Sequence, residues 1–270
     1  MTNPLAVVTG ASSGIGSVFA RRLAAQGYDL LLIARRGERL EQLAAELARA
    51  HRTGAEACVA DLSTAEDMDR VAARLAAEPR LELLVNNAGF GVKGRVWEAP
   101  LEDQLRMHHL HIDAILRLTH AALGPMVARG HGAIVNVASV AGFTRSPGSV
   151  SYCASKSWLT AFTEGLYLDL KSAGSPVTVQ ALCPGFTYSE FHDVAGVDRA
   201  SIAKSLWMSA EDVVDASLDG LRRRKLFVVP GWRYKLVVAL VHRIPLRLRL
   251  AAELAAPHNS ARLDGRNNPG

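Results

Sequence analysis

The segment Pro4-Leu-Ala-Val-Val-Thr-Gly-Ala-Ser-Ser-Gly-Ile-Gly16 decides the fold of this chain. Its apolar start predicts a buried strand, and a helical pattern follows over residues 17–26. Between the two, Gly10, Gly14 and Gly16 allow a tight turn and a close approach of the backbone to a pyrophosphate. The N–H groups and the positive dipole end of the helix favour an anion at the same place. The segment therefore predicts a strand, a glycine-rich turn and a helix that together hold a dinucleotide.

Strand-like and helix-like runs alternate along the rest of the chain, which is the pattern of βαβ units in a parallel sheet. The predicted strands are 5–8, 29–34, 56–60, 82–85, 132–138, 177–182 and 226–229, and the predicted helices are 15–26, 37–51, 65–77, 101–128, 151–173 and 210–223. We therefore predict an α/β fold of the Rossmann type: a doubly wound, parallel, seven-stranded sheet with helices on both faces.

A second informative stretch is Tyr152-Cys-Ala-Ser-Lys156, which Ser139 precedes. Residues four apart share one face of a helix, so the Tyr152 phenol and the Lys156 ammonium can lie side by side. A free tyrosine has a pKa of about 10, and a neighbouring positive charge lowers this pKa so that the phenol can act as an acid or base at neutral pH. Ser139, near a predicted strand end, can direct its hydroxyl at the same substrate oxygen.

These features, with Asn86-Asn-Ala-Gly89 and Pro184-Gly185 in order between and after them, resemble the classical short-chain dehydrogenase/reductase family. The resemblance covers roughly residues 4 to 230. It implies a single Rossmann-type domain over residues 1–230, a nicotinamide cofactor, and hydride transfer between an alcohol and a ketone or aldehyde. It also implies a homodimer or homotetramer, since family members often assemble through the helices that carry the Tyr/Lys motif.

By this resemblance, the residues that bind the cofactor follow the carboxyl ends of the strands. They are Gly10, Ser12, Ser13, Gly14, Ile15, Gly16, Arg35, Arg36, Asp61, Leu62, Asn87, Ala88, Gly89, Tyr152, Lys156, Pro184, Gly185 and Thr187. Where a protein that selects NAD usually has an acid after the second strand, this chain has Arg35-Arg36. Two guanidinium groups can clamp a 2′-phosphate, which predicts NADP (NADPH) as the cofactor, with Arg35 the stronger candidate. The alternative is that both arginines merely end a strand at the surface.

The resemblance also assigns catalytic roles. Tyr152 would give a proton to the substrate oxygen, Lys156 would lower the pKa of Tyr152 and hold the nicotinamide ribose, and Ser139 would orient the carbonyl. The family's helix asparagine is replaced here, because its register reads Leu110-His111-Ile112-Asp113-Ala114. His111 is therefore a candidate catalytic residue in that place, since a neutral imidazole both donates and accepts hydrogen bonds. We expect activity to be retained, with Asp113 as a candidate partner and an added ionisation near neutral pH; the alternative is a histidine with a structural role only.

Cysteine usage fits a reducing cytosol. Cys58, Cys153 and Cys183 have no metal-ligand spacing, so no metal is predicted. Cys58 and Cys183 are expected to be buried, whereas Cys153 lies inside the Tyr/Lys motif and is a candidate for oxidation. The chain start shows no signal-peptide pattern, and no apolar stretch reaches the ~20 residues of a membrane-spanning helix. These observations predict a cytoplasmic protein.

The formal net charge of +5 is concentrated near the end of the chain. Nine arginines and lysines and no acid lie between Asp219 and Glu253. No groove-facing element with polar groups that could read bases accompanies them, so a nucleic-acid partner is not predicted.

Two segments depart from the alternating pattern. Residues 186–209 are small and polar without a clear period, and we expect a mobile flap over the substrate. Residues 231–256 form a basic, apolar extension, in which 230–250 either pack on the body, lie on an anionic membrane surface, or join subunits. Residues 257–270 are expected to be disordered.

The sequence therefore predicts an NADP-dependent oxidoreductase that interconverts a ketone or aldehyde and an alcohol. Phe191, Trp207 and Met208 in the flap suggest a hydrophobic or lipid-like small-molecule substrate. Two alternatives stay open at this stage: an NADP(H)-binding regulatory protein whose turnover is impaired by His111, and a membrane-surface interaction protein that acts through residues 230–250.

Overall fold

The computed structural model describes residues 3–191, 202–241 and 243–255. Its centre is a seven-stranded sheet in the order β3-β2-β1-β4-β5-β6-β7, and every pair of neighbouring strands is parallel. The strands are β1 (Leu5–Thr9), β2 (Asp29–Ala34), β3 (Ala55–Val59), β4 (Leu81–Asn86), β5 (Ala133–Val137), β6 (Thr178–Leu182) and β7 (Phe227–Val228). The predicted Rossmann-type fold is confirmed, and its strand order reverses between β1 and β4.

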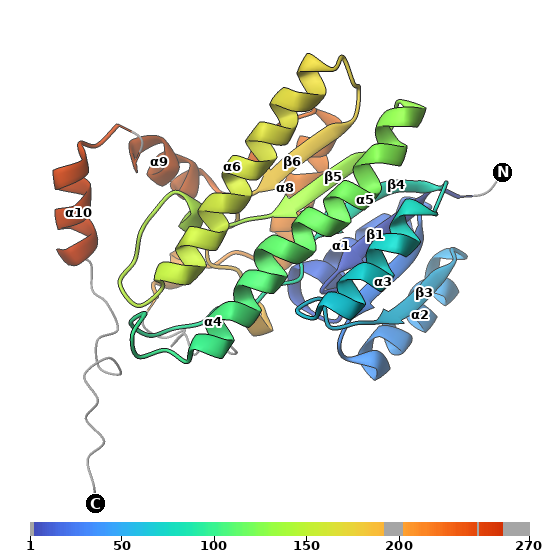
Figure 1. Ribbon diagram of the computed structural model, residues 1–270, viewed down its shortest axis with the longest axis horizontal. Coiled ribbons are helices and arrows are strands. Elements are labelled where there is room, and N and C mark those ends of the chain that lie inside the picture. The colour runs from blue at the N-terminus through green and yellow to red at the C-terminus, as the bar shows by residue number, and fades with distance from the viewer. Residues whose placement is uncertain (1–2, 192–201, 242, 256–270) are drawn as a thin grey trace, which may run out of the picture.

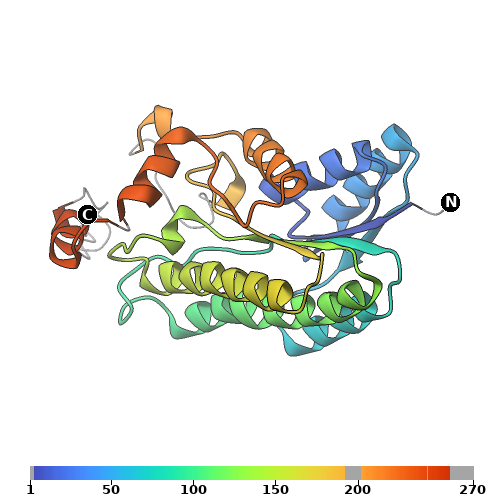
Figure 2. The same ribbon diagram turned by 90° about the horizontal axis from the view of Figure 1, so that it is seen from above.

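Helices cover both faces of the sheet (Figures 1 and 2). One layer holds α1 (Gly14–Ala25), α2 (Gly37–His51) and α8 (Ala210–Arg222), and the other holds α3 (Ala65–Ala76), α4 (Leu101–His108), α5 (Ala114–Arg129) and α6 (Val150–Ser172). A separate apolar core fills the space between each layer and the sheet. The central strands are buried on both faces, which explains why they read as continuous apolar runs rather than alternating ones.

The helix predicted over residues 101–128 is interrupted. A π-helical turn, η1 (His109–Asp113), separates α4 from α5. A π-turn inserts a residue into the hydrogen-bond ladder, and such turns are frequent at functional sites. Here the turn carries His111 into the protein interior, where the side chain is 0% exposed.

The region predicted to be a mobile flap is fixed at both of its described ends. Thr187 pairs with Met208 as an isolated parallel bridge, and the backbone N–H of Tyr188 donates to the carbonyl of Met208 at 2.9 Å. A short 3₁₀ turn, η4 (Lys204–Leu206), precedes that bridge. The middle of the predicted flap, residues 192–201, lies outside the described residues.

The C-terminal extension contains two helices, α9 (Trp232–Val241) and α10 (Leu246–Ala255). Tyr234 of α9 is buried against the body, whereas α10 stands at the far end of the molecule from the N-terminus (Figure 1). Among the described residues, no helix is long and apolar enough to cross a membrane. The predicted disordered tail, residues 257–270, lies outside the described part of the chain.

Candidate active site

Ser139, Tyr152 and Lys156 meet at the carboxyl end of β5. Ser139 follows this strand and caps the 3₁₀ turn η2 (Val140–Gly142), where its hydroxyl accepts from the Ala141 N–H at 3.1 Å. Tyr152 and Lys156 lie in the first two turns of α6, where the Ser139 hydroxyl is near enough to the Tyr152 phenol to affect its pKa. The Lys156 Nζ lies 5.9 Å from the centre of the Tyr152 ring and donates to the Val137 carbonyl at 2.9 Å.

Burial controls the ionisation of this pair. It raises the pKa of Tyr152 to about 12, against the opposing effect of the nearby Ser139 hydroxyl. It also lowers the pKa of Lys156 to about 8. The expected lowering of the Tyr152 pKa by Lys156 is therefore not what the structure shows, because desolvation dominates and the ammonium is turned toward a backbone carbonyl.

His111 is held by two hydrogen bonds in the core. Its Nε2 accepts from the backbone N–H of Phe90 at 3.3 Å, and its Nδ1 lies 2.9 Å from the Ser155 Oγ. Because an amide N–H can only donate, the proton of a neutral ring belongs on Nδ1, which then donates to Ser155. The Ser155 hydroxyl in turn donates a hydrogen bond to the backbone carbonyl of Tyr152 at 2.8 Å. The two rings of His111 and Tyr152 are 6.0 Å apart, edge to face.

Two expectations about His111 are wrong. Asp113 pairs with His109, at 2.6 Å between Oδ2 and Nδ1, because the π-turn directs these two side chains to the exposed side. The pKa of His111 is lowered well below its ordinary value, first by burial and then by the charge of Lys156. A histidine in this state stays neutral near pH 7 and adds no ionisation there.

The glycine-rich turn is tied to the end of β4. Asn87 donates from Nδ2 to the carbonyls of Thr9 and Gly10, at 2.8 and 3.2 Å, and the Thr9 hydroxyl accepts from the backbone N–H of both Asn87 and Ala88. A Cβ on Gly16 would lie 2.3 Å from the Gly10 carbonyl oxygen, so only glycine permits this packing. The helix α1 begins here, and its N-cap residue Ser13 makes no side-chain cap. The first N–H groups of α1 are thus available to a phosphate.

The two predicted arginines point in different directions. Arg35 approaches Asp61, at 4.0 Å between Nη1 and Oδ2. Arg36 instead donates to the hydroxyls of Ser12 and Ser13, each at 2.9 Å from Nη2. Arg36 therefore lies directly beside the glycine-rich turn.

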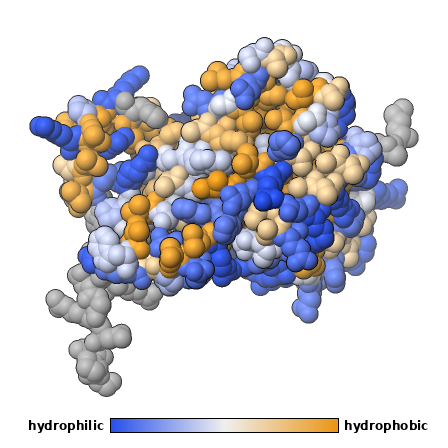
Figure 3. All heavy atoms as spheres, viewed as in Figure 1, coloured by the Kyte–Doolittle hydropathy of each residue, from blue (hydrophilic) through white to orange (hydrophobic). Residues whose placement is uncertain are grey.

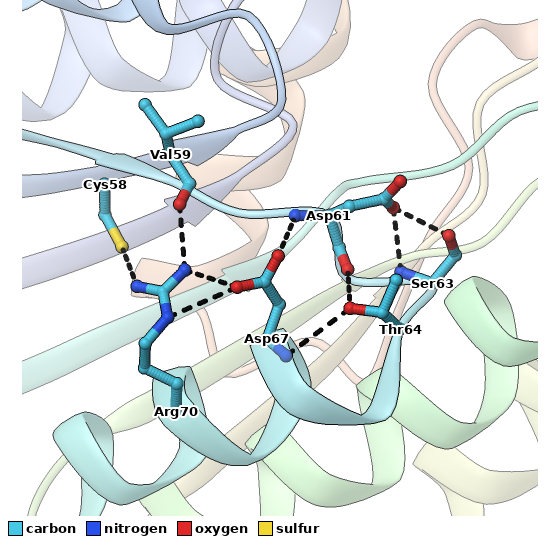
Figure 4. A network of polar contacts seen from close by, with 7 residues as sticks. All are labelled: Cys58, Val59, Asp61, Ser63, Thr64, Asp67 and Arg70. Atoms are coloured by element: carbon cyan, nitrogen blue, oxygen red, sulfur yellow. Dashed lines mark hydrogen bonds and ion pairs between the residues drawn. The ribbon is translucent and has the colours of Figure 1, made fainter.

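Asp61 is fixed by a network that extends into α3 (Figure 4). Its carboxylate accepts from the N–H and hydroxyl of Ser63, at 3.0 and 2.7 Å, and its own N–H donates to Asp67 at 2.7 Å. Arg70 completes the network by bonding Asp67 and the Val59 carbonyl. The next residue, Leu62, is buried in the core below.

The segment after β6 closes the site from the other side. Pro184 accepts from the Ser139 hydroxyl at 3.4 Å, and the Thr187 hydroxyl donates to the Gly185 carbonyl at 3.1 Å. The ring of Phe191 lies 5.7 Å from that of Tyr152.

Phe191, which the sequence suggested for the substrate, does lie beside Tyr152. The sequence interpretation missed three residues that contact this site: Ser155, Glu190 and Tyr234. Ser155 stands inside the Tyr/Lys motif and so carried a signal, but the others depend on how the chain returns to the site from β6 and α9.

All three cysteines are free and buried. Burial raises the pKa of Cys153 and raises that of Cys183 to about 12. The prediction that Cys153 is a candidate for oxidation is therefore wrong, because the thiolate is disfavoured and the sulfur is out of reach of solvent.

Comparison with known proteins agrees with this geometry. Residues 4–199 match the model of the family described as short chain dehydrogenase. Over 220 residues the chain is 37% identical to sulfoacetaldehyde reductase 2 of Chromohalobacter salexigens. The matched region covers 78% of this chain and 85% of that protein.

Two solved structures have a similar fold. One is a short-chain dehydrogenase from Sphingobium yanoikuyae in complex with NADPH, with a TM-score of 0.81, 34% identity, and coverage of 96% of this chain and 99% of the other. Another, from Burkholderia phymatum in complex with NAD, has a TM-score of 0.79, 28% identity, and coverage of 90% and 94%. The chain belongs to the short-chain dehydrogenase/reductase family, whose members are oxidoreductases that interconvert alcohols and carbonyl compounds using a nicotinamide cofactor.

Proposed function

We propose that this protein is an NADP-dependent reductase of ketones or aldehydes, working on a hydrophobic substrate. The observation that carries the proposal is the meeting of Ser139, Tyr152 and Lys156 at the carboxyl edge of the sheet, where Lys156 lies 5.9 Å from the Tyr152 ring and donates to Val137, at the end of the strand that Ser139 follows. It brings a proton donor and a positioning hydroxyl together beside the glycine-rich turn.

The Tyr152 phenol can supply the proton that a reduction needs. With a pKa of about 12 the phenol is protonated at neutral pH and can donate its proton to an alkoxide forming on the substrate. Ser139 can donate a second hydrogen bond to the same oxygen. When bound, the nicotinamide supplies the hydride in this direction and accepts it in the reverse one.

Lys156 and His111 hold Tyr152 in place through contacts with its ring and its backbone. Lys156 spans from the Val137 carbonyl toward the Tyr152 ring and, by the family pattern, holds the nicotinamide ribose. His111 fixes Ser155 and, through it, the backbone carbonyl of Tyr152. We assign His111 the role of positioning Tyr152 in place of the family asparagine, and expect turnover to be retained.

The residues at the adenosine end fit a cofactor with a 2′-phosphate. The first turn of α1 has no side-chain cap, and Arg36 is held by Ser12 and Ser13 beside it. No acidic residue follows β2 directly. Arg36, with its contacts to the turn, is a stronger candidate for the phosphate than Arg35, which faces Asp61.

A hydrophobic substrate is favoured by the rings around Tyr152. Phe90 lies 6.3 Å from the His111 ring, and Phe191 lies 5.7 Å from the Tyr152 ring. Trp207 stacks on Tyr188 at 4.9 Å and packs against Phe186 in the segment that closes the site. Such a lining suits an apolar group next to the carbonyl better than a charged one.

Deuterium transfer tests this function. The protein is incubated with NADPH deuterated at the nicotinamide C4 and with pooled ketones, aldehydes and lipid extract, and labelled alcohols are sought by mass spectrometry. A labelled product that Tyr152→Phe does not form would support the proposal. If no label appears from a protein that binds NADPH, and His111→Asn restores transfer, the protein is instead a binding protein with impaired turnover.

We infer a second property, contact with an anionic membrane surface, from the exposed faces of α9 and α10. Apolar residues recur every four positions and are exposed on both helices: Trp232, Leu236 and Leu240 on α9, and Leu246, Leu250 and Leu254 on α10. Arginine and lysine residues flank them in the sequence, and Figure 3 shows hydrophobic and hydrophilic residues side by side on the surface around α10. An apolar stripe with basic flanks suits a helix lying in the lipid interface.

Vesicle co-sedimentation tests this second property. The protein should sediment with vesicles containing phosphatidylserine and less with phosphatidylcholine alone, and Leu250→Glu should abolish the difference. A doubled mass in light scattering that Leu250→Glu halves would show instead that the stripes cover a second copy of the chain.

A further inference from the structure

The proposed cofactor needs the space between the glycine-rich turn and Tyr152, which we call the cofactor groove, and residues 189–191 of the chain itself lie there. A Cβ on Gly14 would be 2.9 Å from the Cβ of Ser189, so the segment after β6 is packed directly on the glycine-rich turn. Two residues later, Phe191 packs against the Tyr152 ring. Residues 189–191 therefore contact both the phosphate end of the groove and its catalytic end.

Glu190, between these two, reaches across the turn to α2. Its Oε2 accepts from Arg36 Nη1 and its Oε1 from Arg39 Nη1, both at 2.7 Å. Arg36 holds the hydroxyls of Ser12 and Ser13 with its remaining nitrogens. The Glu190 carboxylate thus lies among the groups that we assign to the cofactor's 2′-phosphate.

A carboxylate and a phosphate are both oxyanions that arginine binds through paired N–H groups. Arg36 first, and then Arg39, lower the pKa of Glu190 to about 2, so its charge is present throughout the neutral range.

We propose that Glu190 is an internal competitor of the cofactor: its carboxylate holds Arg36 and Arg39 and keeps residues 189–191 in the groove, and NADPH binding exchanges this carboxylate for the 2′-phosphate. Arg39 is then a second ligand of that phosphate, beside Arg36. This inference rests on the proposed NADP-dependent function.

The contacts of the chain before Ser189 indicate where the movement starts. Tyr188 and Thr187 are fixed to Met208, so the change in backbone conformation begins at Ser189. The two ion pairs of Glu190 with these arginines are also weak, because the side chains of Glu190, Arg36 and Arg39 are 44%, 43% and 49% exposed. Two exposed ion pairs shift an equilibrium by about three- to tenfold, so Glu190 lowers cofactor affinity without blocking binding.

Direct binding measurements on the full chain test the proposal. Dissociation constants for NADPH and for NADH are measured by tryptophan fluorescence for the wild type, Glu190→Gln and Glu46→Gln. Glu46 is a matched control, since it is an exposed carboxylate paired with one arginine, Arg21, at 2.5 Å. Glu190→Gln should tighten both cofactors by the same factor, about three- to tenfold, because the segment must leave the groove before either binds. Glu46→Gln should change neither.

Arg39→Gln separates the two roles of this arginine. It removes one of the ion pairs that hold Glu190, so NADH should bind more tightly, while NADPH should gain nothing because a phosphate ligand is lost as well. An equal gain for both cofactors would remove Arg39 from the phosphate site.

Two results would overturn the proposal that Glu190 competes with the cofactor. One is that Glu190→Gln leaves both dissociation constants unchanged. The other is that it tightens the binding of NADPH alone, which would indicate repulsion between Glu190 and the phosphate within the bound complex. Amide hydrogen exchange over residues 189–191 gives a readout without cofactor, and Glu190→Gln should accelerate it. Equal wild-type affinity for NADH and NADPH would refute the NADP preference yet leave this comparison valid.

Discussion

The buried, neutral state of His111 should be visible in the pH dependence of stability. Its pKa in the folded chain lies well below that of a histidine in an unfolded chain, which is about 6.5. Below that pH the unfolded chain takes up a proton that the folded chain refuses. The free energy of unfolding contributed by His111 is therefore fully present above about pH 6.5 and falls as the pH drops.

The size of the effect follows from proton linkage. While the folded imidazole stays neutral, each pH unit below about 6.5 costs about 1.4 kcal/mol, which sets an upper limit of about 2 kcal/mol for the loss between pH 7 and pH 5. His111→Asn removes the titrating group and keeps a side chain that can donate to Ser155 or accept from Phe90. The variant should therefore lack this part of the acid destabilisation, whatever its stability at pH 7.

Urea unfolding at pH 5, 6 and 7 gives the free energy of unfolding of the wild type and of His111→Asn. The effect is the change of this free energy with pH in the wild type minus the same change in the variant. The other titrating groups contribute equally to both proteins and cancel. His120→Asn, on the exposed side of α5, shows whether loss of any histidine has the same result. Parallel pH dependences for the wild type and His111→Asn would refute the idea that a buried, uncharged imidazole sits at this position.

Three further predictions follow from the contacts of the site and the core. Tyr152→Phe removes the proton donor and should lower kcat by at least about a hundredfold while NADPH still binds, measured by single-turnover kinetics and fluorescence titration. Asn136 is fully buried and bonds both Asn86 and Thr163 at 2.9 Å, so Asn136→Leu should cost about 2–4 kcal/mol in urea unfolding; a cost under about 0.5 kcal/mol would contradict the network. Gly185→Ala would put a Cβ 2.0 Å from the Tyr234 ring and should lower the free energy of unfolding by about 1–3 kcal/mol, whereas Gly165→Ala, with open space in α6, should be neutral or stabilising.

Local patterns were sufficient to predict the sheet and most helices. Each predicted strand overlaps an observed one, because buried parallel strands read as apolar runs and the helices carry one apolar stripe. The prediction failed at His109–Asp113, where a π-turn changes the helix phase without any proline or glycine to mark it.

The site was predictable where one motif supplies several groups. Tyr152, Lys156 and the glycine-rich turn have fixed spacings, and the structure brings them to one edge of the sheet. The contacts of Glu190 with Arg36 and Arg39 join residues more than 150 positions apart, so no spacing rule could indicate them. The ionisation of Tyr152 and His111 depends on burial, which the sequence shows only as a tendency.

The packing of Tyr234 has a consequence for where the catalytic domain can be cut. Its ring lies against Gly185, and its hydroxyl donates to the Leu206 carbonyl at 2.5 Å and accepts from the Phe186 N–H at 3.0 Å. A fragment that stops after β7 would leave a ring-sized hole beside Pro184-Gly185 and an amide and a carbonyl without their phenol. The first turn of α9 is thus part of the packing behind Pro184-Gly185, and the shortest fragment that keeps this packing complete extends past Tyr234.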